Sequence, residues 1–499
     1  MDVTITPLRE HKGTARIWLQ GNTLLRNGFE PGTKYKRVVK NGVLVLTRTE
    51  DDDFMLTQLD DGAKVRLVSS RTRNGKQTPI IDVANDEVAQ MFEGMKNLRV
   101  VLNPGKILIM PPASEIRARA RLERAYARVA AGLPLKVGSF AHGGGILSRA
   151  LEVGAAKEGI PFKLMLANEY REDLIDHVID HNPAWSPETM SLCGPMQEFA
   201  FDSAILQMAA EHIGDDGELD HIEAGIPCSG ASVAGRAKRG LVHPEAHPEV
   251  GHLIAPFIAL IAKFNPSSIT LENVTQYLNT ASMDILRTML RDLHYDVYET
   301  VVEGAEWNAL ENRKRMVMVA VTKGMSFSFG DMVRPEPRAR KLGEILEDLP
   351  LDHPSWSEMT GLKAKAVRNK EAGNSFAMQI YDEESPSINT LTKGLAKNRS
   401  TDPKIRNSEN PDLLRIPTPK EHARAKGIPE EMIGDLCATT AHEMLGQSVN
   451  FDPFVSVGQV LAQSYKKLRS RQPMVELQAR MLGDAVIARA KQRAKAKLH

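Results

Sequence analysis

Residues 225–240, GIPCSGASVAGRAKRG, contain the residue types of a nucleophilic site. Cys228 follows Pro227 and precedes a loop of small side chains and a short basic run. A cationic setting favours the thiolate, which is the nucleophilic form of cysteine. A cysteine that only packs in a core is the common alternative, but the restricting proline, the small loop and the basic run count against it. We therefore predict that Cys228 is a nucleophile.

The elements that must position this cysteine alternate between apolar strands and helices from residue 135 onward. Such alternation predicts an α/β fold with a doubly wound sheet. In such sheets ligands bind beyond the carboxyl ends of the strands, and GIPC follows a strand directly. The predicted strands are LKVGSF, FKLMLANE, HIEAGIP, SSITLEN, YDVYETVV and RMVMVAVT.

A glycine-rich turn follows the first of these strands, in KVGSFAHGGGILSRAL. Gly143–Gly145 let the backbone approach a ligand closely, and the next helix begins with free N–H groups. Glu169 ends the following strand, where a carboxylate suits ribose hydroxyls, and Tyr170 offers an aromatic face for an adenine. A tight strand–helix connection without a ligand is the alternative interpretation.

These motifs, together with four that follow them, resemble those of the DNA cytosine-5 methyltransferases. GIPCSGASVAGRAKRG resembles their catalytic loop and SFAHGGG their methyl-donor loop. LENV, YDVYETVVEGAEWNALENRKRMVMVAV, RIPTPKEHARAKGIPEEM and LGQSVNFDPFVSVGQVLA follow in the family's order. The resemblance spans about 136–465. It implies a Rossmann-like core dependent on S-adenosylmethionine, which methylates carbon 5 of a flipped-out cytosine in double-stranded DNA, as in restriction–modification systems.

The resemblance also assigns roles to single residues. Cys228 would add to carbon 6 of the cytosine, and Glu272 would donate a proton to ring N3. Arg313 and Arg315 would act as donors, one toward the base carbonyl and one toward Glu272 or a phosphate. The predicted donor-binding residues are Phe140, His142, Gly144, Gly145, Glu169, Tyr170, Pro227, Ser448 and Val449. The predicted DNA-binding residues are Ser232, Arg236, Lys238, Arg239, Lys393, Lys397 and Arg399.

Several positions depart from the family's pattern. His142 stands where glycine is usual, Gly138 where an acidic residue is usual, and Pro195 where the family has the aspartate that holds the adenine amine. Gln447 replaces an asparagine near the donor. These changes leave donor affinity and donor identity open. Two alternatives therefore stay open: a DNA-binding regulatory protein with little turnover, and an RNA cytosine-5 methyltransferase.

The first 112 residues read as short strands separated by turn signals, with Asn41-Gly42 predicting a tight hairpin. The piece RIWLQGNTLLRNGFEPGTKYKRVVKNGVLVL resembles the small β-domain of the AbrB and SymE group, and a similar plan is expected to recur in 65–110. That resemblance implies DNA binding or self-association. An accessory module with another ligand is the open alternative.

Domain boundaries follow from these patterns. We expect a β module over 1–112, a basic helical connector over 113–134 and a catalytic core over 135–330. A short target-recognition region is expected over 331–413, the C-terminal part of the core over 414–470 and a basic helical tail over 471–499. Arginines of the connector, and Lys404 and Arg406 of the recognition region, are further candidates for phosphate contact.

The composition of the chain mainly excludes classes of protein and of site. The 499 residues carry a formal net charge of +1, and 42% are hydrophobic, which is typical of a globular protein with two or three domains. Three cysteines without metal-ligand spacing predict neither a disulfide framework nor a metal site. No apolar run is long enough to cross a membrane, and the first residues lack a signal-peptide layout. The expected location is the cytoplasm.

Overall fold

The computed structural model describes residues 1–11, 14–40, 42–50, 64–73, 75–84, 91–92, 94–227, 243–373 and 378–469. The described residues up to Glu123 form one unit, and those from Arg124 to 469 form a second. Five predicted site residues lie outside the described residues, as does the predicted tail 471–499: Cys228, Ser232, Arg236, Lys238 and Arg239.

A seven-stranded sheet forms the centre of the second unit, in the order β13-β12-β11-β14-β15-β18-β16. Its strands are β11 (Leu135–Phe140), β12 (Phe162–Glu169), β13 (Met190–Cys193), β14 (His221–Ala224), β15 (Ser268–Asn273), β16 (Tyr295–Glu303) and β18 (Lys314–Thr322). The first five in this order are parallel, and β18 runs antiparallel to both of its neighbours. The strand order reverses between β11 and β14, which confirms the doubly wound prediction.

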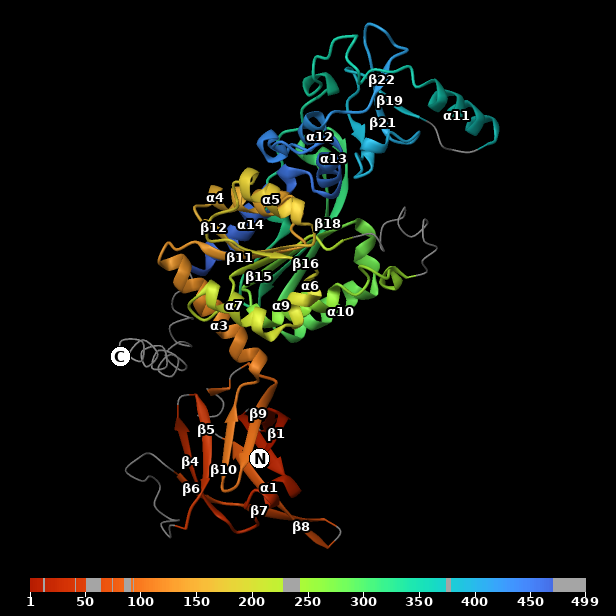
Figure 1. The fold of residues 1–499 in the computed structure, drawn as a ribbon. Coiled ribbons are helices and arrows are strands. Elements are labelled where there is room, and N and C mark those ends of the chain that lie inside the picture. Colours follow the sequence, from red (N-terminus) through yellow and green to blue (C-terminus); the bar gives the residue numbers. More distant parts are fainter. Residues whose placement is uncertain are drawn as a thin grey trace. The chain divides into compact units, whose positions relative to one another are not determined.

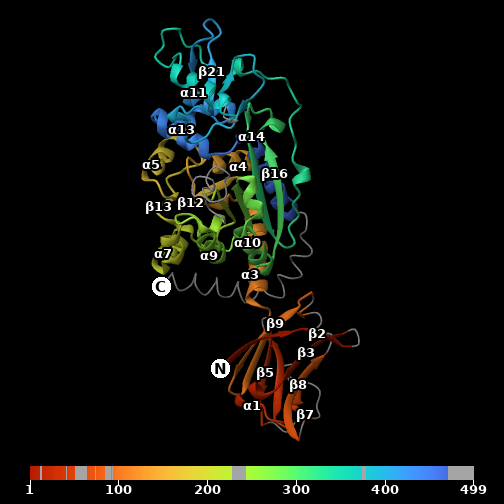
Figure 2. The same cartoon turned by 90° about the vertical axis from the view of Figure 1, so that its right-hand side faces the viewer.

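Helices cover both faces of this sheet (Figures 1 and 2). One face carries α4 (Ile146–Lys157), α5 (Glu172–His181) and α14 (Phe451–Arg469), and the other carries α7 (Ser203–Ile213), α9 (Ile254–Phe264) and α10 (Ala281–Asp292). Glycines let α4 and α14 touch at their backbones, because a Cβ atom on Gly154 or Gly458 would overlap the opposite helix. All six residues of β15 are buried, as expected for a strand covered on both faces.

The first unit consists of two repeats of the same five-strand plan. The first has β1 (Asp2–Pro7), β2 (Arg9–His11), β3 (Thr14–Gln20), helix α1 (Asn22–Arg26), β4 (Lys34–Lys40) and β5 (Val43–Arg48). The second has β6 (Lys64–Leu67), β7 (Ser69–Arg73), β8 (Lys76–Ala84), β9 (Asn97–Asn103) and β10 (Lys106–Met110). The sheet orders are β1-β9-β10-β5-β4-β6 and β2-β3-β8-β7. Each repeat's first strand therefore pairs with the hairpin of the other repeat, and the predicted recurrence is confirmed.

The registers give this arrangement a two-fold relation. Between β5 and β10, Leu44 pairs with Ile109 and Leu46 with Ile107, on either side of the Val45–Leu108 pair. Between β3 and β8, the residues on either side of the central pair exchange partners in the same way, with pairs Ile17–Val83, Trp18–Asp82 and Leu19–Ile81. The side chains of both repeats fill one apolar core.

Two details of this unit differ from the sequence prediction. KVRLVSS was expected as one strand, but it forms β6 and β7 in different sheets, separated at the buried Val68. Strands β1 and β2 were not predicted, because they precede the first clear turn signal. Asn41 of the predicted hairpin turn lies outside the described residues, although Lys40 and Val43 pair across it.

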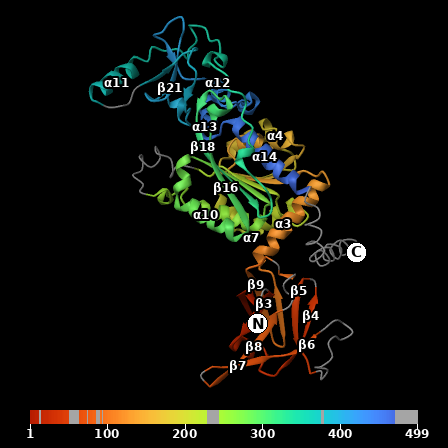
Figure 3. The same ribbon diagram turned by 180° about the vertical axis from the view of Figure 1, so that it is seen from behind.

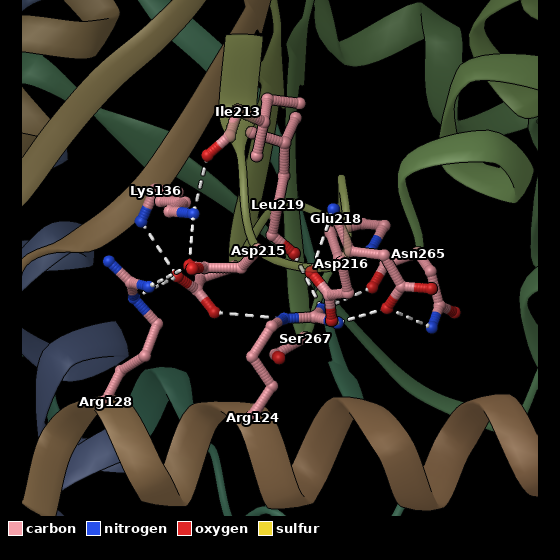
Figure 4. Close-up of polar contacts among 12 residues, drawn as sticks. Arg124, Arg128, Lys136, Ile213, Asp215, Asp216, Glu218, Leu219, Asn265 and Ser267 are labelled. Carbon is pink, nitrogen blue, oxygen red and sulfur yellow. Dashed lines mark hydrogen bonds and ion pairs between the residues drawn. The ribbon is translucent and has the colours of Figure 1, made fainter. Parts of the chain in front are cut away.

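Helix α3 (Ala113–Ala130) carries arginines that pair with acidic residues of the second unit (Figure 4). The Arg124 guanidinium forms ion pairs with Glu218, with Asp220 at 3.2 Å and with Asp216 at 3.4 Å. Arg128 lies 3.1 Å from the carboxylate of Asp220, which is fully buried. The prediction that the connector's arginines contact phosphate is therefore wrong for these two, because each already neutralises a carboxylate.

This ion cluster lies at the amino ends of the strands. Asp220 directly precedes β14, and its carboxylate accepts a hydrogen bond of 2.8 Å from the backbone N–H of Lys136, near the start of β11. Doubly wound sheets bind ligands at the opposite edge. The cluster therefore fixes Arg124 and Arg128, which belong to the second unit, to the sheet and does not face the candidate site.

The segment between β18 and α14 adds a small, separate core. It contains α11 (Thr360–Glu371), β19 (Gln379–Tyr381), β20 (Ile388–Asn389), β21 (Pro403–Arg406), β22 (Leu414–Arg415), α12 (Pro419–Ala425) and α13 (Ala438–Gln447). Strands β19, β21 and β22 form a three-stranded sheet, and β20 pairs with β17 (Glu311–Asn312). Helix α11 was not predicted and lies at the end of the unit remote from α7 and α10 (Figure 3). Within the described residues, no helix is both long and apolar enough to span a bilayer.

Candidate active site

The predicted site residues gather at the carboxyl edge of the central sheet. Phe140 and Glu169 end β11 and β12, and Glu272 lies one residue before the end of β15. Gly225 follows β14 between two of these positions. A Cβ atom on it would lie 3.6 Å from the Glu272 carboxylate and 3.8 Å from the carbonyl oxygen of Ala141. The structure therefore brings the predicted donor loop, the start of the segment that leads to Pro227 and the predicted acid together.

Glu272 is a buried carboxyl group with one close cationic partner. Its Oε1 lies 2.8 Å from Nε of Arg315, which comes from the start of the antiparallel strand β18 at the same edge. Burial raises the pKa of Glu272, and the Arg315 guanidinium only partly opposes this effect. A carboxyl group with a raised pKa holds its proton more readily near neutral pH and can donate it.

Arg313 has a different environment from Arg315. Its side chain is buried, and Nη2 donates a hydrogen bond of 2.9 Å to the carbonyl oxygen of Gly446 at the end of α13. Its Nη1 lies 3.7 Å from the carboxylate of Glu311. Of the two predicted arginines, Arg315 contacts Glu272, whereas Arg313 binds the end of α13.

The glycine-rich turn approaches its neighbours too closely for side chains. Gly143 and Gly145 have φ angles of 58° and 69°, which L-residues other than glycine rarely adopt. A Cβ atom on Gly145 would also overlap the Asn182 amide, and one on Gly144 would overlap Met444 of α13. The loop is therefore held between α5's C-terminal end and α13.

Glu169 contacts this loop directly. One carboxylate oxygen accepts a hydrogen bond of 2.7 Å from the N–H of Gly143, and the other accepts one of 3.1 Å from the N–H of Arg171. Each oxygen keeps a second lone pair. Tyr170, the next residue, is 72% exposed, so its ring is available to a ligand at this edge.

The Gly194–Pro195 departure lies beside Glu169. The N–H of Gly194 donates a hydrogen bond of 2.8 Å to the Glu169 carbonyl, and the Asn168 amide donates one of 2.9 Å to the Gly194 carbonyl. Backbone contacts therefore hold this turn at the carboxyl edge without the family's aspartate. Asn168 was not singled out in the sequence, although it occupies the strand position before the predicted carboxylate.

A buried polar network lies beneath the glycine-rich turn, and the sequence did not reveal it. Nδ1 of His142 lies 2.8 Å from the Ser139 hydroxyl, and the Ser148 hydroxyl donates a hydrogen bond to Glu223. Burial lowers the pKa of His142 to about 4 and raises the pKa of Glu223 to about 7. His142 is therefore neutral at physiological pH, and its ring supports the turn from below.

The predicted C-terminal donor residues follow α13. The Ser448 hydroxyl donates a hydrogen bond of 2.7 Å to the Leu445 carbonyl, and Val449 is buried. The next residue, Asn450, donates a hydrogen bond of 3.3 Å to the Glu311 carbonyl. This segment is therefore fixed to β17, which directly precedes Arg313 and Arg315 in the chain.

The predicted DNA-contacting residues of the recognition region divide into two groups. Lys393, Lys397 and Arg399 are exposed. Lys404 is fully buried, and its ammonium group donates to the carbonyl oxygens of Arg399 and Asp402. The prediction of phosphate contact is therefore wrong for Lys404. The missed helix α11 has no buried residue and presents basic side chains: Lys363, Lys365, Arg368 and Lys370.

Cys228 itself lies outside the described residues. The segment that leads to it is fixed, because the Asn273 amide donates a hydrogen bond of 3.0 Å to the Ile226 carbonyl. Pro227, the predicted donor contact, is the last described residue before the gap and is partly exposed. The other two cysteines, Cys193 and Cys437, are exposed and unpaired with each other.

Comparison with solved structures shows the same fold. The S. pombe Dnmt2 methyltransferase aligns with a TM-score of 0.52 at 16% identity, over 67% of this chain and 99% of that one. The Entamoeba histolytica methyltransferase EhMeth aligns with a TM-score of 0.52 at 14% identity, over 67% of this chain and 99% of that one. The second unit thus has the Rossmann-like fold of these methyltransferases.

Curated relatives are similar in sequence over about half of the chain. The type II methyltransferase M1.ScrFI of Lactococcus lactis subsp. cremoris is 28% identical over 238 residues, which cover 46% of this chain and 59% of the relative. The type II methyltransferase M.SsoII of Shigella sonnei is 27% identical over 242 residues, covering 46% and 61%. The chain thus spans about 60% of the length of these two relatives.

The family described as C-5 cytosine-specific DNA methylase matches residues 201–466. The matched segment contains GIPC, LENV and the Arg313–Arg315 strand, and it ends within α14. Because this match covers more than half of its 499 residues, the chain belongs to the C-5 cytosine-specific DNA methylase family.

Proposed function

We propose that this chain transfers a methyl group from S-adenosylmethionine to carbon 5 of cytosine in DNA. The observation that carries the proposal is the buried Glu272–Arg315 pair, 2.8 Å apart, beside the segment that leads to Cys228. A protonated carboxyl group, an arginine and a cysteine at one edge are the set that addition to a pyrimidine ring requires. Membership of the family supports the same reaction.

The residues at the carboxyl edge fit the methyl donor. Glu169 has lone pairs left for ribose hydroxyls, and the exposed ring of Tyr170 lies beside it for an adenine. A Cβ atom on Gly143 would meet no atom within 4 Å, so the turn is open at this residue. S-adenosylmethionine supplies an electrophilic methyl group when bound. Phe140, Pro227, Ser448 and Val449 complete the proposed donor contacts.

The chain's own residues supply the rest of the chemistry. In the proposed mechanism the Cys228 thiolate adds to carbon 6 of the base, and the electron pair moves toward carbon 5 and ring N3. Glu272 donates a proton to N3, so that negative charge does not build up on the ring. Arg315 holds Glu272 in place and can donate to the base carbonyl. After methylation the carbon-5 proton leaves and the thiolate is eliminated.

Access to carbon 6 requires the base to leave the stack. We assign the stabilisation of the opened duplex to the basic loop after Cys228, which includes Ser232, Arg236, Lys238 and Arg239. Phosphate contacts are assigned to the exposed Lys393, Lys397 and Arg399 of the recognition region.

A trapping experiment tests this function. The full chain is incubated with S-adenosylmethionine and a duplex that carries 5-fluorocytosine, which cannot lose its carbon-5 substituent. Wild type, Cys193→Ala and Cys437→Ala should form a covalent adduct, whereas Cys228→Ala should form none. An RNA duplex of the same sequence should not be trapped. Tight DNA binding without donor binding would favour the regulatory alternative, and trapping of RNA alone would favour the RNA methyltransferase.

For the first unit we propose the finer resemblance to the AbrB and SymE group, with duplex DNA as its ligand. The repeated strand plan and its two-fold pairing support this proposal. Because the two repeats pair with each other inside one chain, their pairing gives no reason to expect a second chain. A chain that begins at Ala113 keeps Arg124 and Arg128 on the core and should bind DNA less tightly than the full chain. Equal affinities would assign the unit another ligand.

A further inference from the structure

Three potential metal ligands gather on the second unit, among residues that the proposed methyl transfer does not use. His177 and His181 lie one turn apart on α5, and Asp435 follows the short helix η7 (Glu430–Ile433). One ligand atom from each of the three residues lies within 4.8 Å of the other two. Nε2 of His181 is already 3.2 Å from the Asp435 carboxylate. Residues four apart share one helix face, and the two imidazole rings are 4.9 Å apart.

His177 provides an independent observation. Only 6% of this residue is exposed. Its Nε2 lies 3.0 Å from the carbonyl oxygen of Met432, so this nitrogen carries the proton and donates it. Nδ1 then carries a lone pair, and it is buried without a hydrogen-bond partner among the described residues. A buried acceptor without a partner costs free energy. A metal-bound histidine typically has this arrangement, with its other N–H on a carbonyl.

Gly434 explains how the Asp435 segment reaches α5. Its φ angle is +53°, and a Cβ atom there would overlap the ring of His181. Any other residue would therefore separate the loop from the helix. The close approach is built into the chain at this position, and it places a carboxylate next to two imidazoles.

We propose that His177, His181 and Asp435 bind one divalent transition-metal ion, for which zinc is the best chemical match. Two imidazoles and a carboxylate, with water as the fourth ligand, are a common tetrahedral zinc donor set. Ligand atoms about 2 Å from a tetrahedral ion lie roughly 3.3 Å apart. The His181–Asp435 distance already agrees with this value, and the 92% exposed Asp435 side chain is free to adjust.

The ion connects elements that border proposed donor contacts, since α5 follows Tyr170 and α13 precedes Ser448. It joins α5 to the segment before α13, while Arg171 at the start of α5 forms an ion pair of 2.9 Å with Glu443 of α13. Both ends of α5 are then held by the C-terminal segment. Sequence spacing could not reveal the site, because Asp435 and the two histidines are far apart in the chain and no cysteine takes part.

Metal titration of the full chain tests the proposal. The chelator-treated protein is titrated with Zn²⁺ alone by calorimetry, and with Co²⁺ while visible absorption is recorded. Wild type should bind one ion per chain with high affinity. His181→Ala and Asp435→Asn change partly exposed side chains, so both should fold, and each should bind at least tenfold more weakly. The control His252→Ala removes an exposed histidine elsewhere and should leave the affinity unchanged.

The Co²⁺ spectrum separates this site from binding by other histidines. Wild type should show the intense visible bands of a tetrahedral ion, and His177→Gln should lose them even where weak binding persists. The metal should raise the melting temperature of wild type and not that of Asp435→Asn. Two results would overturn the proposal: no saturable Zn²⁺ binding by wild type, or equal affinities in wild type, His181→Ala and Asp435→Asn.

Discussion

Apolar side chains from both repeats fill the interior of the first unit, whereas the second unit buries charged groups at several points. Among the described residues of the first unit, Arg37 and Arg121 are the charged side chains that are buried. In the second unit Glu223, Glu311 and Lys426 are fully buried. A buried charge is costly unless it is paired. The difference indicates that paired polar groups hold much of the interior of the second unit, whereas the interior of the first unit is held mainly by apolar contacts.

The largest effect is expected on catalysis at Glu272. Glu272→Gln keeps the shape of the side chain but cannot donate a carboxyl proton, so the single-turnover methylation rate should fall about 10²- to 10⁴-fold. DNA affinity should stay the same. Glu299→Gln is the matched control, because Glu299 also pairs with an arginine, Arg287, at 2.7 Å but lies outside the site. A rate within threefold of wild type would contradict the proposed role.

The second effect is on folding stability at a buried ion pair. The ammonium group of Lys426 lies 2.6 Å from Glu311, and both side chains are fully buried. Lys426→Met removes the closest cation of this carboxylate, which keeps the Leu391 N–H at 2.7 Å and Arg313 at 3.7 Å, and should lower the free energy of unfolding by about 3–5 kcal/mol. Urea denaturation of the second unit, which contains Trp185, Trp307 and Trp356, measures this loss. Adding Glu311→Gln should restore much of it, and a failure to restore it would point to packing instead.

The corresponding test in the first unit removes apolar contacts. Leu46→Ala and Ile109→Ala change two-fold-related positions that are both fully buried. Each should lower the free energy of unfolding by about 2–5 kcal/mol, by similar amounts and equally at pH 5 and pH 8. Trp18 fluorescence reports on this unit, and the exposed Thr47→Ala is the control. Strongly unequal losses would show that the repeats do not contribute alike.

The last effect is a pH dependence of folding stability that arises from Glu223. Burial raises its pKa to about 7 from an ordinary value of 4.5, so between these values the folded chain keeps a proton that the unfolded chain has lost. Stability from this group is complete below pH 4.5 and is lost as the pH rises toward 7, by about 1.4 kcal/mol per pH unit.

Glu223→Gln removes this titration. The free energy of unfolding of the variant minus that of wild type should therefore rise between pH 5 and pH 7, as measured by denaturation at several pH values. Glu211→Gln, at an exposed position on α7, serves as the control. A difference that does not change with pH would show that Glu223 is already ionised when folded.

The sequence predicted six of the seven strands of the central sheet, because most of them are apolar runs bounded by turns, but it missed the short edge strand β13. It also predicted which residues share the carboxyl edge, since a doubly wound fold places strand ends together. The sequence did not predict which side chains pair with each other across the fold. Arg124 and Asp220 are 96 positions apart, and no local pattern connects them. Helix α11 was missed because its exposed, basic surface has no apolar period.

Within the site, the order of motifs pointed to Glu272 and both arginines. It did not distinguish Arg313 from Arg315, because the two residues are identical in type and their partners lie on different elements. His142 read as a departure from the donor loop, yet its ring belongs to a network with Ser139 and Ser148. That network joins a turn, a helix and a strand, so only the fold brings its members together.

The paired repeats of the first unit have a consequence for how this unit can change. Two separate copies of one short chain would come apart on dilution, and every substitution would appear on both sides of their axis. Because both repeats belong to one chain, they do not separate on dilution, and a substitution in one repeat leaves the other unchanged. Divergence is already visible across the axis: Arg16 forms an ion pair with Asp82 at 2.7 Å, whereas the two-fold-related positions are occupied by Ile80 and Trp18. The fused unit can therefore present two different faces where a symmetric dimer would present the same face twice.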